Sequence, residues 1–68
     1  MSESGWFHLD FLVIRQETDK AFQVMDTERN LYWIPKSVIC DVEDYQAGDR
    51  DGTISIAYWF AQKEGIGE

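Results

Sequence analysis

Apolar side chains recur at every second position between residues 6 and 15, where aromatic and β-branched residues are also frequent. This period of two predicts a β-strand with one face toward the core. The opposite face is polar at its start and apolar toward its end, so we expect the strand to bend across two layers. The face expected in the core comprises Phe7, Leu9, Phe11 and Val13.

Two shorter alternating runs follow, Ala21–Met25 and Leu31–Ile34, and each is preceded by a polar turn. Asn30 is expected to take the left-handed backbone conformation that such turns need. Pro35 ends the third strand because proline has no amide proton to donate. Three strands joined by short turns predict an antiparallel meander.

The chain after the third strand alternates less clearly. Residues 36–39 are too few for an α-helix and predict a 3₁₀ turn, and a weak strand is predicted near residues 38–42. The acidic stretch that follows predicts a loop in which Gly48 and Gly52 bracket a turn. A β-branched alternating run at residues 53–56 predicts a further strand.

Residues 57–66 predict a short C-terminal helix. Gly65 stands where a glycine just beyond a helix belongs, and Ile66 is placed for the hydrophobic contact of a Schellman end. A helix of about two to three turns is marginal by itself, so it must dock on the sheet. We expect some of its aromatic side chains to close one end of the sheet, drawn from Tyr58, Trp59 and Phe60.

These elements predict a mainly β fold: a small antiparallel β-barrel or bent sheet, SH3-like or OB-like, of four or five strands with a short C-terminal helix. Residues 1–68 form a single domain, and residues 1–5 are expected to be disordered. A chain this short buries only about 60% of its unfolded surface, so self-association is a further route to stability. Beyond the first strand, the predicted core comprises Phe22, Val24, Ile34 or Trp33, Ile54, Ile56 and Phe60.

The chain carries 13 acidic and 6 basic residues, a formal net charge of −7. This charge disfavours duplex DNA, because affinity for DNA comes mainly from neutralising phosphates. It favours solubility and basic partners. The apolar runs are too short to cross a bilayer, a signal peptide is not expected, and Cys40 has no second cysteine to pair with. We therefore expect a cytoplasmic protein without membrane contact.

Cys40 and His8 are the residues to consider for nucleophilic catalysis, but nothing in their spacing links them. We expect Cys40 to be a small buried hydrophobe and His8 to lie on the surface. The acidic loop does not fit an EF-hand: with Gly52 aligned on the invariant loop glycine, Tyr58 replaces the bidentate carboxylate. The sequence therefore predicts no catalytic residue, no metal site and no cofactor, and we do not expect an enzyme.

An aromatic ring beside a cation is the arrangement with which small β-barrels bind single-stranded nucleic acid. The candidate rings are Trp6, Tyr32 and Trp33, and the candidate cations are Arg15, Lys20 and Lys36. Neighbouring strand residues point to opposite faces, so of Tyr32 and Trp33 one ring belongs to the core and the other faces solvent. The pattern does not decide which of these two rings is exposed.

The acidic loop is the second candidate interaction surface. A negative field at one end of the fold would attract a basic protein surface or mimic the charge of nucleic acid, especially if the acidic first two turns lay beside it. A set of solvated loops is the alternative interpretation. The loop acids are Asp41, Glu43, Asp44, Asp49 and Asp51.

One pattern spans roughly residues 20–66: a strand, the turn Trp-Ile-Pro-Lys-Ser at 33–37, and a terminal aromatic helix with Trp-Phe-Ala at 59–61. It resembles small β-rich phage and prophage proteins of unassigned function, which are sometimes encoded near replication or recombination genes. The resemblance implies a compact β-rich domain and carries over no catalytic residue. Ala57-Tyr58 departs from it, because the pattern places a proline before the helical tryptophan.

The leading functional hypothesis is a non-enzymatic, acidic interaction module, a phage-type accessory protein that binds another protein. Small size, acidity and the lack of a catalytic set of residues motivate it. The alternative hypothesis is single-stranded nucleic-acid binding through the exposed aromatic ring and Lys36.

Overall fold

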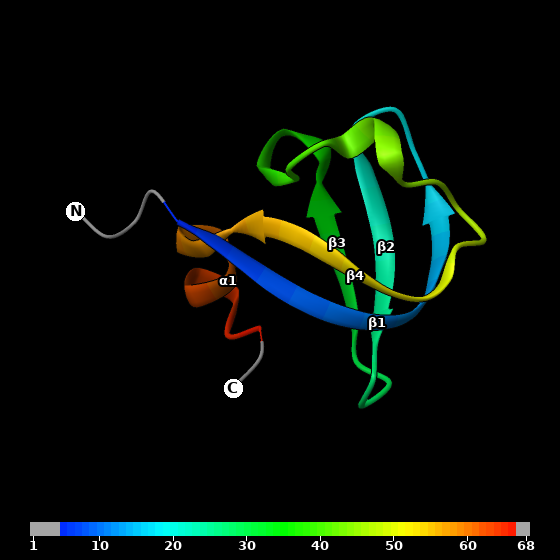
Figure 1. The fold of residues 1–68 in the computed structure, drawn as a ribbon, viewed down its shortest axis with the longest axis horizontal. Helices are drawn as coiled ribbons and strands as arrows, with labels where there is room; N and C mark the ends of the chain where they lie inside the picture. The colour runs from blue at the N-terminus through cyan, green and yellow to red at the C-terminus, as the bar shows by residue number, and fades with distance from the viewer. Residues whose placement is uncertain (1–4, 67–68) are drawn as a thin grey trace.

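The computed structural model describes residues 5–66, which form one open antiparallel sheet of four strands and a C-terminal helix. The strand order is β3-β2-β1-β4, so the predicted meander is extended by β4, which returns to pair with β1 (Figure 1). The predicted fold class is confirmed in its bent-sheet form. The elements are β1 (Trp6–Glu17), β2 (Ala21–Asp26), β3 (Leu31–Pro35), β4 (Arg50–Ala57) and α1 (Tyr58–Glu64).

The predicted disordered segment, residues 1–5, lies outside the described residues except for Gly5, which is an exposed bend.

β1 is longer than the predicted first strand, and its pairing with β2 is irregular. The register shifts between Phe11 and Val13 and again between Ile14 and Gln16. An extra residue in one strand reverses which side chains face the core from that point on. Ile14 is therefore fully buried, whereas Val13, which we expected in the core, is only half-buried.

The segment between β3 and β4 contains two 3₁₀ turns, η2 (Lys36–Val38) and η3 (Val42–Asp44). The first of them confirms the predicted turn. The weak strand predicted after it is reduced to a single bridge between Ile39 and Ile56 of β4. This bridge holds the segment that follows β3 against β4 and so bends the sheet around its core.

The core is built from side chains of all four strands, the 3₁₀ segment and the helix. The sequence left open whether Ile34 or Trp33 lies in the core, and the structure places Ile34 there. Phe7, which was also predicted in the core, is only half-buried. The other predicted core residues are buried as expected: Leu9, Phe11, Phe22, Val24, Ile54, Ile56 and Phe60. The alternation did not predict five further buried residues: Ile14, Val38, Ile39, Ala61 and Ile66.

The helix α1 ends as its sequence predicts. Gly65 takes the left-handed conformation at φ 71°. Its amide donates to the Gln62 carbonyl oxygen at 3.2 Å, and the Ile66 amide donates to that of Ala61 at 2.9 Å. This pair of bonds is the Schellman pattern. The buried side chain of Ile66 then ties the end of the helix to the core.

Two turn predictions are wrong in detail. Gly52 lies within β4 rather than in a turn, and an added Cβ there would stand 2.9 Å from Cζ of Phe11. The left-handed residue of the second turn is Arg29 (φ 69°) and not Asn30. Asn30 is instead held in place by hydrogen bonds to Asp26, so Arg29, the residue before it, takes the left-handed conformation.

Candidate functional site

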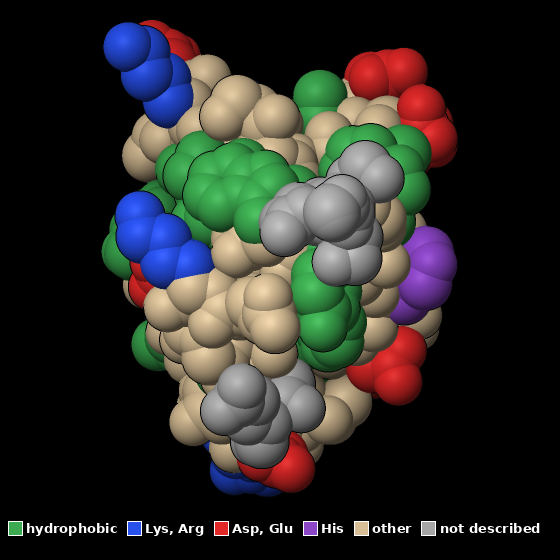
Figure 2. All heavy atoms as spheres, turned by 90° about the vertical axis from the view of Figure 1, so that its left-hand side faces the viewer, with side chains coloured by type: hydrophobic (Ala, Val, Ile, Leu, Met, Phe, Trp, Pro, Cys, Tyr) green, Lys and Arg blue, Asp and Glu red, His purple; other side chains and the backbone are tan. Residues whose placement is uncertain are grey.

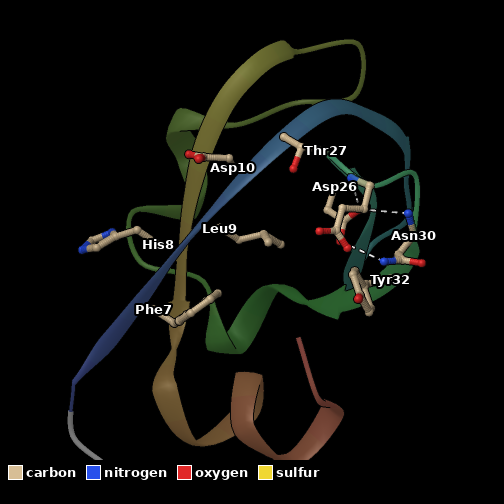
Figure 3. Close-up of a pocket in the computed structure, with 9 residues that line it drawn as sticks. Phe7, His8, Leu9, Asp10, Asp26, Thr27, Asn30 and Tyr32 are labelled. Carbon is tan, nitrogen blue, oxygen red and sulfur yellow. Dashed lines mark hydrogen bonds between the residues drawn. The ribbon is translucent and has the colours of Figure 1, made fainter. Parts of the chain in front are cut away.

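A cleft of about 310 Å³ opens between the first half of β1 and the turn that joins β2 to β3 (Figure 3). One wall consists of residues 7–10 of β1, and the other consists of hairpin residues between Asp26 and Tyr32. The cleft exists because the pairing of β1 with β2 begins only at Phe11 and Asp26, so the hairpin turn extends beyond the last paired residues.

The floor of the cleft is apolar. Leu9 is buried, and Phe7 and Tyr32 are half-buried side chains packed against the core. Figure 3 shows Leu9 directed from β1 toward the hairpin, whereas His8 and Asp10 turn away from it. This division follows from strand alternation, since neighbouring side chains point to opposite faces of a sheet.

The turn wall of the cleft is polar and is organised by Asp26, which is only 6% exposed. Its Oδ1 accepts hydrogen bonds from the amides of Glu28 (2.8 Å) and Asn30 (2.9 Å), and its Oδ2 accepts one from Asn30 Nδ2 (3.3 Å). A carboxylate that accepts backbone amides in this way fixes the shape of a turn. Asp26 therefore holds the wall rigid, and Glu28 adds an exposed negative charge to it.

The negative charge at the cleft affects the pKa of Tyr32. Burial, and then the negative charges of Asp26 and Glu28, raise the pKa of the Tyr32 hydroxyl above its usual value of 10, and Asn30 partly opposes this shift. A phenol near two carboxylates stays protonated because a phenolate would be repelled by them. The cleft therefore presents net negative charge around an apolar floor.

The side chains that turn away from the cleft form cross-strand pairs with β4. His8 Nδ1 lies 2.8 Å from Ser55 Oγ, and Thr53 Oγ1 donates to Asp10 Oδ1 at 2.8 Å. A serine bonded to a histidine is the beginning of a nucleophilic site, but such a site also needs a group that orients the base. None of the hydrogen bonds found among residues 5–66 joins a third group to the His8 ring, so we interpret both contacts as sheet-stabilising pairs. The prediction that His8 lies on the surface is confirmed.

The structure separates the three residues predicted from the aromatic stretch. Tyr32 packs against the core, while Trp33 is 49% exposed on the opposite face of β3. Lys36 is engaged on the core-facing side, where its Nζ lies 2.6 Å from Glu17 Oε2 and 5.1 Å from the centroid of the Phe22 ring. Trp33 and Lys36 therefore do not share a face.

The predicted loop acids surround η3 and the start of β4. Asp41, Glu43, Asp44 and Asp51 are exposed, and Asp49 is half-buried. Asp49 has a local role, because its Oδ2 accepts the Gln46 amide at 3.0 Å. The acids of the first two turns do not form one group, since residues 18–20 and 27–30 lie at opposite ends of β2.

Cys40 is half-buried rather than fully buried, and its thiol faces the Asp41 carboxylate at 3.6 Å. Burial and then the negative charge of Asp41 raise the pKa of the Cys40 thiol, with further contributions from Glu43 and Asp44. A raised pKa disfavours the thiolate, which is the nucleophilic form of cysteine. The environment of Cys40 therefore does not activate it.

A surface that was not predicted as a unit lies where α1 meets the start of β1. Trp6, Tyr58 and Trp59 are 50%, 36% and 46% exposed, and their backbones are joined because Trp6 pairs with Ala57. We call these three residues the aromatic surface. Figure 2, which views this end of the molecule, shows several exposed hydrophobic side chains with other atoms between them and charged groups around them. The clue in the sequence was that a two-turn helix cannot bury three consecutive aromatic rings.

Within residues 5–66, no group of three or more His, Cys, Asp or Glu side chains is arranged to hold a metal ion. In the same part of the chain, no helix has both the length and the apolar character needed to cross a membrane.

Comparison with known proteins yields no match to a family model, to a curated protein or to a solved structure. The resemblance to small phage proteins therefore stays a prediction, and the functional argument rests on the geometry described above.

Proposed function

We propose that this domain is a non-enzymatic interaction module that binds another protein through the aromatic surface formed by Trp6, Tyr58 and Trp59. The observation that carries the proposal is the exposure of three large rings at one end of the molecule, where the start of β1 meets α1, each at least 36% accessible. Trp and Tyr are enriched among the residues that contribute most to protein–protein affinity. The exposed parts of these rings add nothing to the stability of the domain itself, whereas a partner that covered them would gain from burying apolar surface.

The charge of the chain favours a protein over a nucleic acid as the partner. The net charge is −7, and phosphate backbones are repelled by such a field. The alternative, single-stranded nucleic acid bound by an aromatic ring beside Lys36, has weaker support because Lys36 is paired with Glu17. We expect the partner to be a folded protein with an apolar pocket for the rings and basic residues at its rim.

In this proposal the chain acts as a phage-type accessory protein in the cytoplasm. Support for the compartment comes from Cys40, whose thiol is free, because structural disulfides are typical of oxidising compartments.

The test is an affinity capture from a lysate of the producing cells, with Trp59→Ala compared with Trp33→Ala. Both variants remove an exposed indole, but only the first alters the aromatic surface. A partner captured by the wild type and by Trp33→Ala, but lost with Trp59→Ala, supports the proposal. We expect at least about a tenfold loss of affinity when the purified partner is titrated by calorimetry.

Equal capture by both variants would overturn the proposal. So would a concentration-dependent dimer that only Trp59→Ala abolishes, measured by light scattering after size-exclusion chromatography. That result would assign the aromatic surface to self-association.

A further inference from the structure

The first half of β1 has a backbone edge without a neighbour. β1 pairs with β4 from Trp6 to Val13, but its pairing with β2 begins only at Phe11. Among residues 5–66, those from 6 to 10 therefore have a neighbouring strand on one side alone. Unpaired amide and carbonyl groups at a strand edge are a template for adding another strand.

The hydrogen bonds of β4 show which backbone groups of β1 lie on that open edge. The Cys40 amide donates to the Ser55 carbonyl oxygen at 2.9 Å, and the Ser55 amide donates to Tyr45 Oη at 3.3 Å. Both backbone groups of Ser55 therefore point away from β1. Ser55 stands opposite His8, so these two residues form a non-hydrogen-bonded pair, in which the backbone groups of both strands point outward.

The same alternation applies along β1. The Tyr58 amide donates to the Gly5 carbonyl oxygen at 3.0 Å, which makes that position a hydrogen-bonded pair. Every second residue from there, namely Phe7 and Leu9, bonds to β4, whereas His8 turns its amide and carbonyl, and Asp10 its amide, to the open edge. The Asp10 carbonyl faces the Thr27 amide, because the last β1–β2 pair, Phe11 and Asp26, is of the non-hydrogen-bonded type. No backbone hydrogen bond from His8 or Asp10 to a turn or loop occurs within residues 5–66.

The cleft lies along this edge. It is lined by all four residues from Phe7 to Asp10, although the side chains of His8 and Asp10 turn away from it (Figure 3). These two residues therefore line the cleft through their backbones. The cavity and the unpaired edge are therefore two aspects of one feature.

We propose that this cleft accepts a short extended peptide segment bearing Lys or Arg, which pairs with β1 as an additional strand. Strand addition of this type takes its affinity from main-chain hydrogen bonds and its specificity from pockets for alternate side chains. The open edge from Trp6 to Asp10 is about 13–17 Å long at the usual rise of ~3.3 Å per residue. It therefore suits a segment of a few residues.

The walls of the cleft select the side chains of this segment. An apolar residue would fit over the floor of Phe7, Leu9 and Tyr32. A basic residue is favoured at the turn wall, because Asp26 and Glu28 place negative charge there. A second copy of this chain is a poorer occupant, since two clefts of the same negative sign would approach each other.

The test uses a fluorescein-labelled peptide, acetyl-Lys-Val-Lys-Val-Lys-amide, and its counterpart with Glu in place of Lys. We expect saturable binding of the Lys peptide that weakens as salt is raised, and at least about fivefold weaker binding of the Glu peptide. Hydrogen exchange followed by NMR should show fast amides at His8 and Asp10 in the free protein. Both amides should exchange at least about tenfold more slowly with the Lys peptide bound.

Two further controls separate strand pairing from other modes. Two N-methylated versions of the Lys peptide are compared, one methylated at the valine amides and the other at the lysine amides. Each version lacks the backbone donors along one edge of the peptide. At least one of the two should fail to bind, whereas attraction between side chains alone would tolerate both. Glu28→Lys should weaken binding at least about fivefold, while the matched Glu43→Lys, on η3 next to the far edge of β4, should leave it unchanged.

Binding without slower exchange at His8 and Asp10 would overturn the proposal, as would equal loss in the two charge-reversal variants. Without peptide, exchange at these amides that becomes slower as the protein concentration rises would also overturn it. That result would assign the edge to pairing between copies of this chain. The result is independent of the proposed function, because Trp59→Ala should not change the affinity for the Lys peptide.

Discussion

The two halves of β1 belong to one continuous strand but differ in their neighbours. Residues 11–17 pair with β2, whereas residues 6–10 pair with β4 alone. Burial does not reveal this difference, since Leu9 in the first half is 6% exposed and Phe11 in the second half is 3% exposed. Side chains stand perpendicular to a sheet, while backbone donors and acceptors lie in its plane. A strand can therefore be closed toward the core and open at its edge.

The two halves of β1 therefore have different roles. The second half has neighbours on both edges from Phe11 to Ile14, and substitutions there should cost most stability. The first half supports the core through Leu9 but leaves the backbone of His8 and the amide of Asp10 for a partner. Four predictions test this division.

Ile14→Ala should have the greatest effect on stability. Ile14 is fully buried in the second half of β1, and truncation of such a residue costs about 2–5 kcal/mol. Phe7→Ala in the first half should cost only about 1–2 kcal/mol, since Phe7 is half-buried. Urea denaturation followed by tryptophan fluorescence measures both. If Ile14→Ala does not fold, Ile14→Val should still cost about 0.5–1.5 kcal/mol. A larger loss for Phe7→Ala than for both Ile14 variants would contradict the division.

Gly52→Ala tests the junction between the two halves. The new methyl group would lie 2.9 Å from Cζ of Phe11, and overpacking of this kind costs about 1–3 kcal/mol. Phe11→Leu should relieve the clash, so the loss in the double variant should be smaller than the sum of the single losses. Additive losses in thermal or urea unfolding would show that Gly52 is not constrained by the Phe11 ring.

Asp26→Ala removes the acceptor that shapes the turn wall of the cleft. The amides of Glu28 and Asn30 lose their partner, which should cost about 1–2 kcal/mol. Asp10→Ala is the matched control in the first half of β1, because Asp10 is exposed and accepts only the Thr53 hydroxyl. Its cost should stay within about 0.5 kcal/mol. Equal losses would mean that Asp26 does not organise the turn.

The fourth prediction concerns pH and has the smallest effect. The pKa of Tyr32 is raised in the folded state by burial, Asp26 and Glu28, so the folded protein holds this proton more tightly than the unfolded chain does. The resulting stability is present below pH 10 and is lost as pH rises through the folded pKa. NMR titration of labelled tyrosine should show a lower Tyr32 pKa in Glu28→Gln. Glu43→Gln should leave it unchanged, and equal shifts would contradict an acidic cleft.

Local patterns in the sequence predicted much of the fold. Alternation located the strands, Pro35 ended β3, and Gly65 with Ile66 predicted the end of α1. Each of these depends on a few neighbouring residues and on backbone chemistry that acts over one turn. The Val13 prediction was wrong because a bulge depends on how two strands meet, and Phe11, Val13 and Ile14 look equally apolar in sequence.

The candidate sites were less predictable. Alternation showed that Tyr32 and Trp33 point to opposite faces, and the structure then placed Tyr32 against the core. Nothing local indicated that Lys36 would pair with Glu17, 19 residues away. The cleft was also not predictable, because its walls come from residues 7–10 and 26–32.

The sequence by itself determined the secondary structure, the acidic charge and the excess of aromatic rings, because these follow from composition and from spacings of two to four residues. Only the tertiary structure decided which strand edge stayed unpaired and which rings stayed in water. The physical reason is that these properties depend on where a strand stops being paired. That point is set by the return of β4 to β1 and by the lengths of the hairpins, which no single segment of the chain contains.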